Sequence, residues 1–78
     1  MQAIVWSKDF CPYCIKAKDV LKKAGVVYEE RVVGGGWTRE QLLEQVPNAL
    51  SVPQIFIDGN HIGGYNELMK SGILDNIS

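Results

Sequence analysis

The alternation of hydrophobic and polar positions in the first third of the chain predicts a strand followed by a helix. Residues 2–6 form a short apolar run, which is typical of a buried strand. Residues 12–24 show helical spacing instead, because at about 100° per residue one arc collects the apolar side chains and the other the charged ones. The apolar arc consists of Tyr13, Cys14, Ala17, Val20, Leu21 and Ala24. Pro12 suits the first helical position, and Gly25 is a plausible stop.

The remaining pattern predicts an α/β domain in the order β-α-β-α-β-β-α. The further elements are a strand at 26–33, a helix that opens on the capping-box pattern at Thr38 and ends at Pro47, strands at 53–57 and 61–63, and a last helix capped by Asn66 that runs through Lys70. Asp58-Gly59 is a two-residue hairpin signal. A right-handed crossover makes the first two strands parallel. We therefore expect a mixed four-stranded sheet flanked by three helices.

Size and charge narrow the class of protein. With 78 residues the chain suits one small domain, spanning residues 1–78. A net charge of −1 argues against a nucleic-acid binder, and no apolar run is long enough to span a membrane. Residues 1–6 lack the basic start of a signal peptide. The default expectation is a cytoplasmic protein, in which a cysteine pair is catalytic or metal-binding more often than structural.

Both cysteines lie at the start of the first predicted helix. Cys11 precedes the helix and Cys14 falls within its first turn, where backbone N–H groups have no partner inside the helix. Those groups and the nearby Lys8 favour a thiolate at Cys11, so we expect the pKa of its thiol to lie below the ordinary value. Cys14 borders the core-facing arc and should be more shielded. The pattern indicates an attacking Cys11 and a resolving Cys14.

Two structural interpretations of the cysteines compete with this redox pair. A disulfide across two residues closes a small loop and removes little chain entropy. A metal site needs about four ligands, whereas the chain has two cysteines and one histidine, His61, in the predicted hairpin. An intermolecular site that uses Cys11 from two copies stays open. The C-x-x-C spacing at the start of a helix in a β-α-β unit favours the redox pair.

Three segments at consistent spacing resemble one family. Cys11-Pro12-Tyr13-Cys14 resembles the active site of dithiol glutaredoxins, and Lys8 lies where that family often has a lysine. Ser51-Val52-Pro53 resembles its Thr-Val-Pro segment, and the run from Gly63 to Asn66 resembles its Gly-Gly-x-Asp segment. The resemblance covers nearly the whole chain. Short bacterial and bacteriophage glutaredoxins are the most similar in length and element order.

This resemblance implies a thioredoxin fold, a cis peptide bond before Pro53 and glutathione as co-substrate, with no metal. It places Lys8 and Tyr13 near the glycyl end of glutathione and Val52 along its cysteinyl backbone. It places the γ-glutamyl end of glutathione at Gly64, Tyr65 and Asn66. The full set of implied glutathione-binding residues is Lys8, Tyr13, Ser51, Val52, Pro53, Gly64, Tyr65 and Asn66.

Three features depart from the family pattern. Ser51 replaces the usual threonine and keeps the hydroxyl. Asn66 replaces the usual aspartate, which removes a carboxylate that could meet the ammonium group of glutathione. The segment from Gly34 to Trp37 matches no family motif, and we interpret it as a loop with a partly packed tryptophan or as a rim that contacts a partner or glutathione.

The expected function is a glutathione-dependent thiol-disulfide oxidoreductase. It would reduce protein disulfides and glutathione mixed disulfides through Cys11 and Cys14, as a monomer. Ribonucleotide reductase is a family-level expectation for its protein substrate. One alternative is a glutaredoxin-like thioredoxin that takes electrons from a thioredoxin reductase. Another is an iron–sulfur cluster carrier, which Pro12 and Cys14 argue against.

Overall fold

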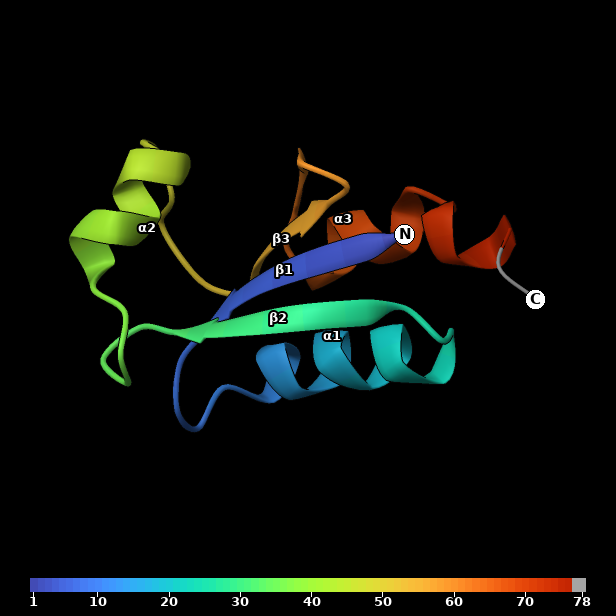
Figure 1. Ribbon diagram of the computed structural model, residues 1–78, viewed down its shortest axis with the longest axis horizontal. Coiled ribbons are helices and arrows are strands. Elements are labelled where there is room, and N and C mark those ends of the chain that lie inside the picture. The colour runs from blue at the N-terminus through green and yellow to red at the C-terminus, as the bar shows by residue number, and fades with distance from the viewer. Residues whose placement is uncertain (77–78) are drawn as a thin grey trace.

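The computed structural model describes residues 1–76, and its elements follow the predicted order (Figure 1). The elements are β1 (Gln2–Ser7), α1 (Pro12–Lys23), β2 (Val27–Val32), α2 (Arg39–Gln45), β3 (Gln54–Ile57), β4 (Asn60–Gly63), α3 (Tyr65–Lys70) and a 3-10 turn, η1 (Ile73–Asn76). Within the described range no helix is both long and apolar enough to cross a membrane.

The four strands form one mixed sheet in the order β2-β1-β3-β4. β1 runs parallel to β2, and β3 pairs antiparallel with β4, as predicted. β1 also pairs antiparallel with β3, which joins the two halves of the sheet. The β3–β4 turn places both Asp58 and Gly59 at positive φ, of 50° and 86°, which is the backbone that an Asp-Gly pair accommodates. The thioredoxin fold is confirmed.

One face of the sheet is covered by α1 and α3. The apolar arc of α1 buries Ala17 and Leu21 completely against Val5 and Ile55, and Leu68 of α3 joins the same cluster. Ala17 has no side chain beyond Cβ, so α1 can approach the sheet closely. Burying one large aliphatic side chain contributes about 1.5–3 kcal/mol, so this cluster fixes α1 and the cysteines at its start.

The other face is covered at one end by α2, which Figure 1 shows beside the end of β1. Trp6 of β1 is buried there with Leu42 and Val46. Trp37 packs edge-on against Trp6 with 5.3 Å between ring centroids, and the guanidinium of Arg31 lies 4.4 Å from the Trp37 ring. This cluster anchors the loop from Gly34 to Trp37 and the start of α2.

Two predicted details of the helices are wrong. Asn66 does not cap α3, because the cap is Gly64, whose N–H donates to Glu67 Oε1 at 2.8 Å. The glutamate three residues past Gly64 supplies the acceptor, so the helix starts two residues earlier than predicted. Tyr13 was expected on the buried arc but is more than half exposed, because its ring packs against Tyr65 at the edge of the helix, with centroids 5.9 Å apart.

Candidate active site

The cysteine pair lies at the start of α1, directly after the loop that follows β1. Cys11 and Cys14 form a disulfide, with 5.2 Å between their Cα atoms. Cys11 is the N-cap of α1, and its sulfur accepts the backbone N–H of Cys14 at 3.3 Å. Phe10 enters this turn at a φ of 57°. The predicted placement of both cysteines at the helix start is therefore confirmed.

The two sulfurs differ less in burial than the sequence suggested. Cys11 is 6% exposed and Cys14 is 1% exposed, so both are buried, with Cys11 nearer to solvent. Cys11 Sγ lies 3.8 Å from the carbonyl oxygen of Val52, and the Val52–Pro53 peptide bond is cis, as the family resemblance implied. An incoming sulfur that reaches Cys11 must therefore pass beside the backbone of Val52.

A pocket beside Cys11 gathers seven of the eight predicted glutathione-binding residues. Its lining consists of Tyr13, Ser51, Val52, Pro53, Gly64, Tyr65, Asn66 and Glu67. These residues come from the start of α1, the segment before β3 and the start of α3, which are far apart in sequence. Glu67 was not predicted, although its place three residues after Gly64, in a capping box, is a signal that the sequence contains.

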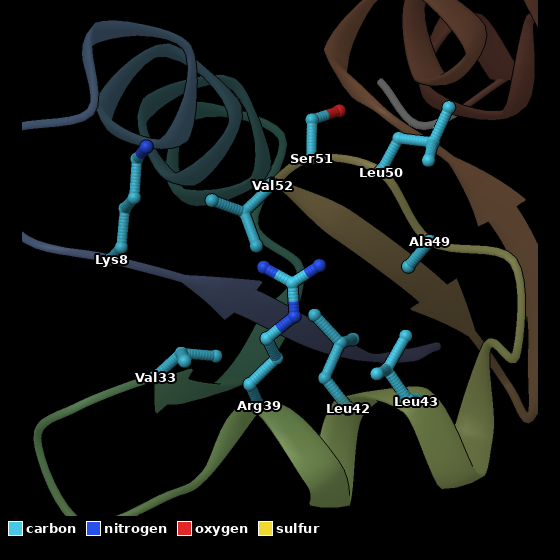
Figure 2. Close-up of a pocket in the computed structure, with 9 residues that line it drawn as sticks. All are labelled: Lys8, Val33, Arg39, Leu42, Leu43, Ala49, Leu50, Ser51 and Val52. Atoms are coloured by element: carbon cyan, nitrogen blue, oxygen red, sulfur yellow. The ribbon is translucent and has the colours of Figure 1, made fainter.

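A second, more apolar pocket adjoins the first, because Ser51 and Val52 line both (Figure 2). Lys8 enters it from the loop after β1 and Arg39 from the start of α2, with the Arg39 guanidinium directed toward Val52 in Figure 2. Neither cation forms an ion pair with any residue in the described part of the chain. This pocket holds the predicted Lys8 together with a second cation.

Arg39 was missed at the sequence level, although a signal for it exists. It occupies the first position of α2, directly after the N-cap Thr38. A positive charge there opposes the helix dipole by about 0.3–1 kcal/mol, so helix stability does not explain the residue. A cation at the wrong end of a helix is the kind of local conflict that marks a binding residue.

A polar network supports the end of β1 that carries Lys8. The fully buried Ser7 hydroxyl donates to Glu30 Oε2 at 2.7 Å, and Lys18 Nζ donates to the same oxygen at 2.6 Å. These bonds, that of Lys18 first and that of Ser7 second, lower the pKa of the Glu30 carboxyl below its ordinary value. The network ties β1, β2 and α1 together one helical turn beyond Cys14.

Neither of the other sequence features adds a site. Trp37 lines neither of the two pockets around Cys11. Its ring packs against Trp6 and the guanidinium of Arg31 instead of at the rim of the site. His61 is exposed on β4 and its Nε2 lies 2.8 Å from Gln54 Oε1. Between residues 1 and 76 no group of three or more His, Cys, Asp or Glu side chains is placed to hold a metal ion.

The fold and the cysteine pair define a thioredoxin-fold thiol-disulfide oxidoreductase. The glutaredoxin family model matches residues 3–62, so the chain belongs to the glutaredoxin family. It is 40% identical over 79 residues to glutaredoxin 1 of Rickettsia prowazekii, covering 95% of this chain and 83% of that one.

Solved structures agree with this assignment. Reduced Escherichia coli glutaredoxin superposes with a TM-score of 0.82 at 33% identity, covering 96% of this chain and 99% of that one. A buckwheat glutaredoxin–glutathione complex superposes with a TM-score of 0.78 at 30% identity, covering 96% of this chain and 74% of the buckwheat chain. The membership that the sequence motifs implied is confirmed.

Proposed function

We propose that this protein is a glutathione-dependent reductase of protein disulfides and glutathione mixed disulfides, acting as a monomer in the reducing cytosol. The observation that carries the proposal is the pair of adjoining pockets at Val52, whose carbonyl oxygen lies 3.8 Å from Cys11 Sγ. One pocket holds two unpaired cations, the other lies between α1 and α3, and Ser51 and Val52 line both. Glutathione is an extended, anionic peptide thiol, and two adjoining pockets with free cations at one end suit it.

The reaction starts from the reduced pair. Cys11 thiolate attacks one sulfur of the substrate disulfide, that bond breaks, and the leaving sulfur departs as a thiolate that takes up a proton. Cys14 then loses its proton and attacks the Cys11 sulfur, which forms the Cys11–Cys14 disulfide and releases the second thiol. The N–H of Cys14, which points at Cys11 Sγ, stabilises negative charge on that sulfur whenever it leaves or attacks.

Glutathione restores the dithiol in two exchanges. One glutathione thiolate attacks Cys11, breaks the disulfide and leaves a mixed disulfide with Cys14 reduced. A second glutathione attacks the sulfur of the bound one, which frees Cys11 and yields glutathione disulfide. In the bound state, the backbone of Val52 pairs with the cysteinyl residue of glutathione as an added strand would, while Lys8 and Arg39 meet the glycyl carboxylate.

Two exposed apolar side chains near Cys11 are suited to contact protein substrates. Phe10 and Leu50 directly precede Cys11 and Ser51, and they are 98% and 94% exposed. Two fully exposed large apolar side chains beside a reactive sulfur are suited to contact the residues that flank a substrate cysteine. Leu50 lines the pocket that holds Lys8 and Arg39, whereas Phe10 lines neither pocket. A small mixed disulfide seated in the pockets does not reach Phe10, so Phe10 should matter for protein disulfides alone.

A coupled assay tests the proposal. The protein should turn over a glutathione mixed disulfide with glutathione, glutathione reductase and NADPH. If turnover occurs only with a thioredoxin reductase in place of the glutathione system, the protein is a glutaredoxin-like thioredoxin and the proposal is wrong.

A further inference from the structure

We infer that the pocket that contains Lys8 and Arg39 binds a C-terminal residue with an apolar side chain, placed directly after the substrate cysteine. The inference rests on the proposed function, because it uses the direction in which that proposal places glutathione, with the glycyl carboxylate at the two cations. It also goes beyond that proposal. Glutathione has glycine at this position and leaves the apolar part of the pocket empty, whereas a peptide thiol that ends in leucine after the cysteine fills it.

The lining of the pocket is more apolar than a carboxylate requires. Three of its nine residues are polar, namely Lys8, Arg39 and Ser51. The other six are apolar, namely Val33, Leu42, Leu43, Ala49, Leu50 and Val52. A carboxylate is bound by cations and hydrogen-bond donors, so the aliphatic walls match a second, apolar group of the ligand.

The cations and the aliphatic side chains lie in different parts of the pocket. In Figure 2 Lys8 lies to the left of Arg39, whereas the aliphatic side chains of α2 and of the segment before β3 lie to its right, namely Leu42, Leu43, Ala49 and Leu50. A C-terminal amino acid carries its carboxylate and its side chain on the same Cα atom. It therefore presents an anionic and an apolar group together, which is the combination that this pocket complements.

Leu50 is the aliphatic residue of the pocket that the fold does not use. It is 94% exposed and belongs to neither buried cluster, whereas its neighbour Ala49 is buried. A single exposed leucine is ordinary on a protein surface. This one lines a concave site whose other walls are largely aliphatic, so an apolar side chain bound there covers it.

The size of the pocket suits a leucine side chain. Its cavity volume is about 150 Å³. A cavity of roughly this volume with aliphatic walls can hold a benzene-sized molecule, which has more carbon atoms than the side chain of leucine. The pocket therefore has room for the side chain that glycine lacks.

The pocket lies within one residue of the reacting sulfur. Val52 lines it, and the carbonyl oxygen of Val52 is 3.8 Å from Cys11 Sγ. In an extended peptide the next residue lies roughly 3.3 Å further along the strand. When the substrate cysteine is at Cys11, the residue that follows it reaches this pocket.

The test compares three tripeptides that differ only in the last residue. Glutathione, γ-glutamyl-cysteinyl-leucine and γ-glutamyl-cysteinyl-asparagine are each converted to the mixed disulfide with 2-mercaptoethanol. Asparagine is the matched control, because its side chain has as many non-hydrogen atoms as that of leucine and the same branching, but is polar.

The measured step is a single thiol-disulfide exchange with the reduced protein at low substrate concentration. Cys11 thiolate attacks the sulfur of the tripeptide, the disulfide bond breaks, and 2-mercaptoethanol leaves as a thiolate that takes up a proton. Its release is followed by quenched flow and mass spectrometry. Each rate is divided by the rate of the same derivative with dithiothreitol, a small dithiol without a binding pocket.

Wild type should react about fivefold faster with the leucine derivative than with either of the others, since the pocket covers part of the leucine side chain. In Leu50→Asn this advantage should fall to about twofold, and the exposure of Leu50 means that no buried contact is lost. Val27→Thr is the control for loss of exposed apolar surface, because Val27 is 70% exposed and lines neither pocket. It should keep the fivefold advantage.

The failures of this inference and of the proposed function are distinguishable. A wild-type rate with the leucine derivative that is equal to or below the rate with the asparagine derivative would overturn the inference without any variant. An unchanged advantage in Leu50→Asn, or an equal fall in Val27→Thr, would overturn it too. In each case reaction of wild type with the glutathione derivative leaves the proposed function standing, whereas failure to react with all three derivatives would refute that function as well.

Discussion

Replacing Arg39 by glutamine should change ligand affinity and protein stability in opposite directions. Arg39 has two roles in the structure, because it lines the pocket beside Val52 and occupies the first position of α2. As a cation near a ligand carboxylate it favours binding. As a cation at a helix N-terminus it disfavours the helix. A residue kept only for folding would not combine these two effects.

The magnitudes follow from the exposure of Arg39. The residue is exposed, so its attraction for the glycyl carboxylate is that of a surface pair, at about 1 kcal/mol or somewhat less. Since 1.4 kcal/mol corresponds to tenfold, Arg39→Gln should raise the KM for glutathione about fivefold at low salt. Removing the unfavourable dipole interaction should stabilise the fold by about 0.3–1 kcal/mol, which raises Tm by a few degrees.

The assay is steady-state reduction of a mixed disulfide at varied glutathione, with thermal unfolding of the same preparations. Lys22→Gln is the matched control, because Lys22 is an exposed, unpaired cation in the last turn of α1, about 16 Å along the helix from Cys11. Higher salt should shrink the KM difference for Arg39→Gln, since exposed charges are screened. The reasoning is refuted if both variants raise KM equally, or if Arg39→Gln lowers Tm.

Three further predictions concern other parts of the molecule. Cys11→Ser should abolish all activity, whereas Cys14→Ser should keep activity on glutathionylated substrates and lose it on protein disulfides; equal activity of the two variants would overturn the assigned roles. Phe10→Ser should lower kcat/KM for a protein disulfide severalfold and leave that for a small glutathione mixed disulfide unchanged, and a parallel loss on both would contradict the role given to Phe10. Because the pKa of Glu30 is lowered in the folded state, its bonds stabilise the fold fully above its ordinary pKa near 4.5, and this contribution disappears as the pH falls below that value. Denaturant unfolding measures the free energy of unfolding at pH 7 and at pH 3, and this free energy should fall less between the two pH values for Glu30→Gln than for wild type. The difference should be less than about 1 kcal/mol, because the Glu30 side chain is one-third exposed, and an equal fall in both proteins would refute the role of Glu30.

Local patterns were sufficient to predict most of the fold. The apolar arc of α1, the Asp58-Gly59 turn and the capping box at Thr38 each depend on interactions within a few residues, so their spacing in the sequence carries the information. The cap of α3 was placed wrongly because two local patterns compete there. Asn66 is the better capping residue by preference, yet Glu67 reaches back to Gly64 and moves the start of the helix.

The site was only partly accessible to sequence reasoning, because its members meet through tertiary packing. The prediction of an attacking Cys11 depended on residues close to it in the sequence, namely the helix start and Lys8. The closeness of Cys11 Sγ to the Val52 carbonyl, 41 residues along the chain, requires the cis turn and the β1–β3 pairing. The motifs brought Val52 into the prediction only through family resemblance, and nothing in the spacing alone would have done so.

Arg39 and Glu67 are charged residues that line the two adjoining pockets at Val52. Both lie near the start of a short helix, yet their charges relate to that helix in opposite ways. Glu67 is favourable to α3 and caps it, so the stability of the helix alone accounts for its presence. Arg39 is unfavourable to α2, so its presence demands another reason. Arg39 is unpaired within the described residues and lines the pocket beside Val52, so the glycyl carboxylate of the proposed peptide thiol would supply the partner that the helix does not.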